Sequence, residues 1–106
     1  MDIYSNELCK LGYNYKYGID IEKHKKKAFK YYIKAAKLGN AVAINDVAIC
    51  YKNGIGHGIG VEKDEKKAFE YYMKAAKLEN VNAIFNAGVF YYNGIGVEIN
   101  LQEAFK

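Results

Sequence analysis

The stretch AFEYYMKAAKL, from Ala68 to Leu78, decides the fold because the chain contains it more than once. The same positions read AFKYYIKAAKL from Ala28 to Leu38, and the opening letters AFK return at 104–106. Residues 28–54 align on residues 68–94 without a gap and agree at 15 of 27 positions. Copies that start 40 and then 36 residues apart indicate a repeat array, in which each unit buries its apolar face against the next.

Each copy carries the pattern of two helices joined by a tight turn. Small residues and a tyrosine recur at helical spacing, at Ala28, Tyr32, Ala35 and Ala36 and again at Ala68, Tyr72, Ala75 and Ala76. This stripe should be buried. Because only Gly39 and Asn40 separate the first helix from the second, the two must be antiparallel neighbours.

Residues suited to helix ends bracket these segments. Asn40 and Asn80 are good N-caps, whereas Gly54 and Gly94 can adopt the left-handed conformation that ends a helix. Asn100 and Glu103 have the spacing of a capping box. The sequence predicts helices over residues 3–17, 25–38, 41–53, 65–78 and 81–93, and a last one of two turns from residue 101.

A few positions carry further information about packing. One place in the second helix holds only small residues, Gly12, Ala48 and Gly88, which should let a neighbouring helix cross closely. Glu79 stands where Gly39 does and would be strained in a left-handed conformation. His24 replaces the capping Asp64, which leaves the start of that helix in question.

The frame AxxYYxKAAxxxN, followed by the loop NGIGV and a second AF, resembles the Sel-one-like repeat, a relative of the tetratricopeptide repeat. The resemblance covers nearly the whole chain. It implies an all-α, right-handed α-solenoid of antiparallel helix hairpins, with about two full repeats and a partial repeat at each end. We expect one domain over residues 1–106, divided into a partial repeat at 1–27, repeats at 28–67 and 68–103, and the start of a truncated repeat at 104–106.

Composition narrows the classes of function. The formal charge is +4, but all 16 basic residues are lysines, so the bidentate recognition of phosphate or guanine that arginine provides is missing and specific nucleic-acid binding is not expected. No apolar run is long enough to span a membrane and no signal peptide is evident, so we expect a cytoplasmic protein. Cys9 and Cys50 are too few for a disulfide framework and should pack in the core.

Candidate catalytic and metal-binding residues do not form a recognised site. The loop GIGHGIG at 54–60 lacks the glycine spacing of a phosphate-binding loop, and it follows a helix rather than a strand. His24 and His57 lie at different repeat positions, without cysteines at ligand spacing. Ser5, the only serine, has no histidine near it in the sequence. We therefore expect no enzyme activity, no metal and no cofactor. The run KHKKK at 23–27 is interpreted as a solvated first helical turn.

Surface recognition of another protein is the function that remains. Stacked hairpins form a concave groove lined by the first helices, where lysine and tyrosine alternate at helical spacing: Lys27, Tyr31, Lys34, Lys67, Tyr71 and Lys74. Such a surface suits an acidic or amphipathic peptide or helix. The alternative is that these tyrosines only pack between repeats and the lysines are merely solvated. The resemblance implies an adaptor or scaffold, for example in signalling.

A rival hypothesis is a structural spacer, a segment of a longer repeat array that separates other domains such as a kinase. The first unit lacks its leading helix, and Lys106 stands where the repeat would continue. Both ends should then expose apolar faces and could self-associate.

Overall fold

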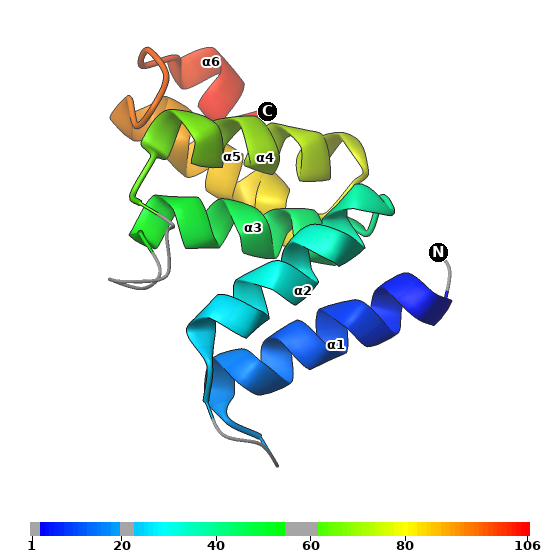
Figure 1. Cartoon of the computed structure of the whole chain (residues 1–106). Coiled ribbons are helices and arrows are strands. Elements are labelled where there is room, and N and C mark those ends of the chain that lie inside the picture. The colour runs from blue at the N-terminus through cyan, green and yellow to red at the C-terminus, as the bar shows by residue number, and fades with distance from the viewer. Residues whose placement is uncertain (1–2, 20–22, 55–61) are drawn as a thin grey trace.

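The structure is a computed structural model that describes residues 3–19, 23–54 and 62–106. Figure 1 shows helices stacked from α1 at one end to α6 at the other, and every regular element in the described part is helical. The fold is the predicted all-α, right-handed α-solenoid. Its helices are α1 (Ile3–Tyr17), α2 (Lys25–Lys37), α3 (Ala41–Asn53), α4 (Glu65–Lys77), α5 (Val81–Asn93) and α6 (Leu101–Ala104). Successive helices pack on one another along the chain.

Side chains before the helices satisfy the free N–H groups at their starts. Asn40 and Asn80 accept hydrogen bonds from the N–H groups three residues on, as predicted. His24 also caps its helix, because its Nδ1 accepts from the N–H of Lys27 at 3.2 Å. The side chain of Asn100 accepts a hydrogen bond from the N–H of Glu103 at 3.0 Å. The Glu103 carboxylate binds Lys106 and does not accept a hydrogen bond from the N–H of Asn100, so the predicted capping box is only half formed.

The turns between the paired helices have the same geometry in both copies. Gly39 has φ +85°, and Glu79 at the same position has φ +64°, so the glutamate adopts the left-handed conformation in which a side chain is strained. The N–H groups of Gly39 and Glu79 each donate to the carbonyl of an alanine in the last helical turn, at 2.9 Å. Each turn thereby satisfies carbonyls that the helix leaves free and fixes the antiparallel pair.

The predicted stripe forms the centre of the core. Tyr32 and Tyr72 are 1% and 0% exposed, and the alanines around them, Ala28, Ala35, Ala68 and Ala75, are buried as well. The other two alanines of the predicted stripe, Ala36 and Ala76, are only half-buried. Gly12 shows why small residues are needed on the facing helix. A methyl group there would lie 2.8 Å from the Tyr32 ring and 3.2 Å from the Ala28 carbonyl oxygen. The close helix crossing expected at this position is therefore confirmed.

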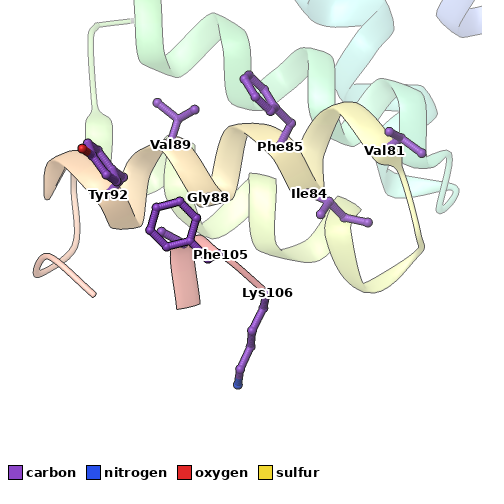
Figure 2. Close-up of a pocket in the computed structure, with 9 residues that line it drawn as sticks. Val81, Ile84, Phe85, Gly88, Val89, Tyr92, Phe105 and Lys106 are labelled. Atoms are coloured by element: carbon purple, nitrogen blue, oxygen red, sulfur yellow. The ribbon is translucent and has the colours of Figure 1, made fainter. Parts of the chain in front are cut away.

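Apolar side chains are exposed at both ends of the stack, as predicted. On α1 they include Ile3, Tyr4 and Tyr13, and at the other end Val81, Phe85 and Phe105. The prediction of two turns for the last helix is wrong, because α6 makes only one turn. Its C-cap is Phe105, whose ring packs edge to face on Tyr92 of α5 at 6.0 Å (Figure 2).

One sequence-based interpretation concerns residues that the structure leaves undescribed. Most of the glycine loop at 54–60, with His57, lies outside the described residues. In the part of the chain that is described, no helix combines the length and the apolar character needed to cross a bilayer.

Candidate functional site

Two parallel-stacked tyrosine pairs recur at equivalent places in the solenoid. The rings of Tyr15 and Tyr31 lie 5.6 Å apart with an interplanar angle of 2°. The rings of Tyr51 and Tyr71 also lie 5.6 Å apart, at 22°. In each pair one ring comes from the end of one helix and the other from the next helix. The first pair therefore joins α1 to α2, and the second joins α3 to α4. All four side chains are half-buried.

A lysine covers each of these rings, which makes the two clusters nearly identical. Lys27 Nζ lies 5.5 Å from the centroid of the Tyr15 ring and Lys34 Nζ 5.7 Å from that of Tyr31. In the second cluster the corresponding distances are 5.2 Å from Lys67 to Tyr51 and 4.9 Å from Lys74 to Tyr71. These are cation–π distances. We call the eight residues the tyrosine–lysine row: Tyr15, Tyr31, Tyr51, Tyr71, Lys27, Lys34, Lys67 and Lys74.

The backbone explains why the same cluster forms twice. The N–H of His24 donates to the carbonyl oxygen of Tyr15 at 2.9 Å, and the N–H of Asp64 donates to that of Tyr51 at 2.8 Å. Each bond ties the start of one helix to the end of the preceding one. This bond brings the tyrosine in the second turn of the following helix, Tyr31 or Tyr71, beside the tyrosine at the end of the preceding one. The lysines four residues before and three residues after Tyr31 or Tyr71 lie on the same face of the helix as that tyrosine.

A small hollow lies beside the second cluster, where α2 and α4 approach each other. Its volume is about 140 Å³, and its lining is Ile33, Ala36, Lys37, Ile44, Tyr71 and Lys74. Ile44 is buried, whereas both lysines are exposed. The hollow is therefore apolar at its base and cationic at its rim, an arrangement that suits an apolar side chain next to a carboxylate.

No acidic side chain of the described part neutralises the row. The ion pairs found there are Lys63 with Glu65 and Lys106 with Glu103, and neither includes a lysine of the row. All four of those lysines are exposed. Their positive charge is therefore available to a partner, although salt will screen it because it lies at the surface.

The structure brings the six sequence-predicted site residues together as two equal groups. Lys27, Tyr31 and Lys34 lie on α2, and the equivalent residues Lys67, Tyr71 and Lys74 lie on α4. The sequence analysis missed Tyr15 and Tyr51, the stacking partners from the preceding helices. A signal was present, since Tyr15, Tyr51 and Tyr91 follow the 36- and 40-residue spacings of the array. Tyr91 contacts Phe69 instead, edge to face at 5.0 Å.

A second cluster of polar groups lies between α1 and α3. Cys9 Sγ donates to Asp46 Oδ2 at 3.8 Å, and Cys50 is buried nearby. Burial, and then the charge of Asp46, raises the pKa of the Cys9 thiol to about 12, and burial also raises that of Cys50 to about 12. Both therefore remain thiols at neutral pH and lack the reactivity of a thiolate. Among the described residues no group of three or more metal-ligating side chains forms.

Asp46 makes the stability of this region dependent on pH. Burial raises the pKa of its carboxyl to about 6, although Lys16 and the thiol of Cys9 act in the opposite direction. Because the folded-state pKa lies above the unfolded value, Asp46 favours folding at pH 4 and loses that contribution as the pH rises through 6. We expect Asp46→Asn to raise the free energy of unfolding at pH 7.5 by about 1–2 kcal/mol and to change it little at pH 4.

Urea unfolding of both proteins at the two pH values measures this difference. Asparagine occupies the equivalent position at Asn86, so the substitution suits the helix. Other carboxylates titrate in both proteins and cancel in the comparison. An effect of Asp46→Asn that is the same at pH 4 and pH 7.5 would contradict the assignment.

Comparison with protein families identifies the repeat. The pattern described as the Sel1 repeat matches residues 8–40, 41–80 and 81–106, which is nearly the whole chain. These units begin at the second helix of each hairpin, whereas the predicted units begin at Ala28 and Ala68, so the two divisions differ in phase. No curated protein matches the chain in sequence.

Solved structures have the same architecture. A Sel1 repeat protein from Oxalobacter formigenes is 32% identical, with a TM-score of 0.86 over 94% of this chain and 39% of that one. A protective antigen with an SLR fold from uropathogenic Escherichia coli is 25% identical, with a TM-score of 0.83 over 94% and 21%. Cysteine rich protein B of Helicobacter pylori is 29% identical, with a TM-score of 0.75 over 95% and 75%. This chain thus spans well under half of the first two structures.

Proposed function

This chain belongs to the Sel1 repeat family, and we propose that it is a non-catalytic interaction module whose tyrosine–lysine row binds an acidic or amphipathic segment of a partner protein. Sel1 repeats are typically protein–protein interaction modules. The observation that carries the proposal is the duplication of the row. Two stacked tyrosines flanked by two lysines occur on adjacent repeats, and the described part of the chain supplies no acid to pair with those lysines.

The chemistry of the row supports a peptide ligand with two kinds of side chain. Half-buried tyrosines offer flat apolar area that costs little conformational entropy to use, because stacking already holds the rings. The lysines offer positive charge, which increases the rate of encounter with an acidic segment and fixes its register. The hollow beside Tyr71 and Lys74 would take an apolar side chain. The proposal places the row on the concave side of the solenoid, as expected from the sequence.

Further observations support the binding of a protein rather than catalysis or nucleic-acid recognition. The Sel1 repeat fold is generally a non-catalytic scaffold. The thiols of Cys9 and Cys50 have pKa values raised by burial, which disfavours them as nucleophiles. Both cysteines are free, and the proposal places the protein in the cytoplasm, where thiols stay reduced. The absence of arginine disfavours a specific nucleic-acid ligand.

A displayed peptide library, selected on the full chain, would test the proposal. We expect selected peptides to combine Asp or Glu with an apolar residue. Binding of one labelled peptide, followed by fluorescence anisotropy, should weaken at least tenfold, or about 1.4 kcal/mol, when Lys34→Glu and Lys74→Glu are combined. The matched control combines Lys26→Glu and Lys66→Glu. It makes the same change in charge on the same two helices, at exposed lysines outside the row.

The dissociation constant of the control variant for the peptide should stay within about threefold of that of the parent, because charges outside the contact act only at long range. Equal losses in the two variants would mean that the peptide responds to net charge and not to the row. Selection of no peptide at all would favour the rival hypothesis, in which the chain is a structural spacer.

A further inference from the structure

The two halves of the tyrosine–lysine row are alike in structure but differ in the charge around them. From residue 23 to residue 38, a stretch that includes α2, the sequence holds seven lysines and no acid. From residue 63 to residue 78, the equivalent stretch with α4, it holds five lysines and three acids. These counts give formal charges of +7 and +2, so the positive charge is concentrated on the α2 side of the row.

One exposed position brings this difference onto the row itself. Lys30 lies three residues after Lys27 and four before Lys34, so it belongs to the same helical face as these two lysines of the row. Glu70 has the same place between the two lysines of the row on α4. Neither Lys30 nor Glu70 forms an ion pair with another described residue. Lys30 therefore adds to the positive potential of its half of the row, whereas Glu70 lowers that of the other half.

The fold accepts either charge at this position, so packing does not explain the difference. Between residues 28–38 and 68–78 the copies differ only here and at Ile33 and Met73. Lys30 and Glu70 are both exposed. Because α4 packs on both α3 and α5 and still exposes the same positions as α2, this exposure is a property of the repeat and does not depend on an end of the chain.

Positive charge at the start of α2 is unfavourable for the free protein. The first turn of α2 contains three lysines at 25–27 and no acid, whereas the first turn of α4 contains Glu65. The start of a helix is the positive end of its dipole, so these lysines are repelled by it and by one another. Acidic side chains of a bound partner would relieve this repulsion, and they would do so more on α2 than on α4.

The hollow between the two helices determines where an apolar side chain of the partner would lie. Ile33 and Ala36 of α2 line one side of it, and Tyr71 and Lys74 of α4 line the other. Lys30 is one helical turn before Ile33. Residues on the two sides of an apolar side chain in the hollow would therefore meet different charges, a continuous positive face on α2 and a mixed one on α4.

We propose that the row binds its partner in one orientation, with a cluster of acidic residues over α2 and the adjoining apolar residue in the hollow between α2 and α4. The partner is thus a segment whose acids are gathered on one side of an apolar anchor. In the reverse orientation the acids would lie beside Glu70, and like charges repel. This inference rests on the proposed function, because it requires a segment bound to the row.

A charge exchange tests the orientation. The variant that combines Lys30→Glu and Glu70→Lys keeps the net charge and every residue of the row, but it moves the excess of positive charge on the row from α2 to α4. The probe is a synthetic peptide with a run of glutamates at one end and a leucine next to the run, spin-labelled at the glutamate end. In NMR spectra the label should broaden amide signals of α2 in the parent and of α4 in the exchange variant.

The affinity of the same peptide, without the spin label, gives a second measurement. Lys30→Glu alone should weaken binding about tenfold at low salt, because α2 then carries the mixed charge of α4. Adding Glu70→Lys should restore the dissociation constant to within about threefold of the parent, since the peptide can bind in the reverse orientation. Circular dichroism would confirm that both variants fold, as expected for substitutions at exposed side chains.

The matched control combines Lys25→Glu and Glu65→Lys. It exchanges the same charges between the same two helices, at exposed positions two residues before Lys27 and Lys67 that do not face the row. The glutamate end of the peptide should stay over α2 in this variant. Equal broadening of α2 and α4 in the parent, or reversal of the peptide in the control, would overturn the proposal.

The combined Lys34→Glu and Lys74→Glu variant separates this inference from the proposed function. If that variant loses the peptide but the exchange variant does not reverse it, the row binds a segment without a fixed orientation, and only the inference fails. Lack of saturable binding of the probe, while peptides selected from the library still bind to the row, would also overturn the inference alone. Absence of binding by both kinds of peptide would overturn the proposed function as well.

Discussion

Replacing Tyr72 by alanine is expected to lower the free energy of unfolding by about 3–5 kcal/mol, a large part of the stability of a chain this short. Tyr72 is 0% exposed, and its ring contacts Phe90 edge to face at 5.1 Å. The same core cluster includes Ala68 and Ala75, whose side chains are too small to fill the space that the ring would leave. Denaturant unfolding followed by circular dichroism measures the loss.

Tyr72→Phe is the matched control and separates the ring from its hydroxyl. Among the described residues, the Tyr72 hydroxyl is the buried side-chain group without a hydrogen-bond partner. Burial raises the pKa of this hydroxyl to about 12, so it is neutral in the folded protein. Removing it should leave the free energy of unfolding unchanged or raise it by about 1 kcal/mol. A phenylalanine variant that is as unstable as the alanine variant would contradict this account of the core.

Asn40→Ala is expected to lower the free energy of unfolding by about 2–4 kcal/mol, more than a simple helix cap would explain. The Asn40 side chain is 1% exposed and accepts a hydrogen bond from the N–H of Ala43 at 3.0 Å. Its amide nitrogen also donates to Ser5 Oγ at 3.3 Å and to Asn6 Oδ1 at 3.0 Å. The substitution removes the cap of α3 and, at the same time, two bonds that join α1 to the start of α3.

Asn80→Ala provides the comparison within the same protein. Asn80 caps α5 through the N–H of Ala83 at 2.9 Å, and its substitution should cost about 1 kcal/mol. Asn40→Asp would keep the acceptor that caps α3 but remove the donor, so its stability should lie between those of Asn40→Ala and the parent. Equal costs for Asn40→Ala and Asn80→Ala would show that the bonds to α1 contribute nothing.

The two asparagines show how far the sequence predicts local structure. Both caps follow from the pattern of a turn before an apolar helix, and both are present. The different surroundings do not follow from that pattern. The residues equivalent to Ser5 and Asn6 in the next repeat are Ala41 and Val42, which cannot accept a hydrogen bond from Asn80. Only the packing of one helix on another shows which neighbour a cap can reach.

Only part of the candidate site was predicted, because contacts between helices do not follow from the pattern within one helix. The periodicity of α2 and α4 places lysine and tyrosine on one face, and this identified Lys27, Tyr31 and Lys34 with their counterparts. Stacking joins Tyr31 to Tyr15, which belongs to the preceding helix. Helical spacing within one element carries no information about a ring on another element, although the spacing between repeats pointed to Tyr15 and Tyr51.

The sequence by itself determined the helices, their ends and the stripe of alanine and tyrosine, because capping bonds and helical periodicity depend on residues a few positions apart. The tertiary structure alone decided which side chains meet across helices. It paired the tyrosines beneath their lysines, placed Asp46 beside Cys9, and left Ile84 exposed where Leu8 and Ile44 are covered. These outcomes depend on the neighbour that packs on each face, and identical repeat positions have different neighbours in the middle of the stack and at its end.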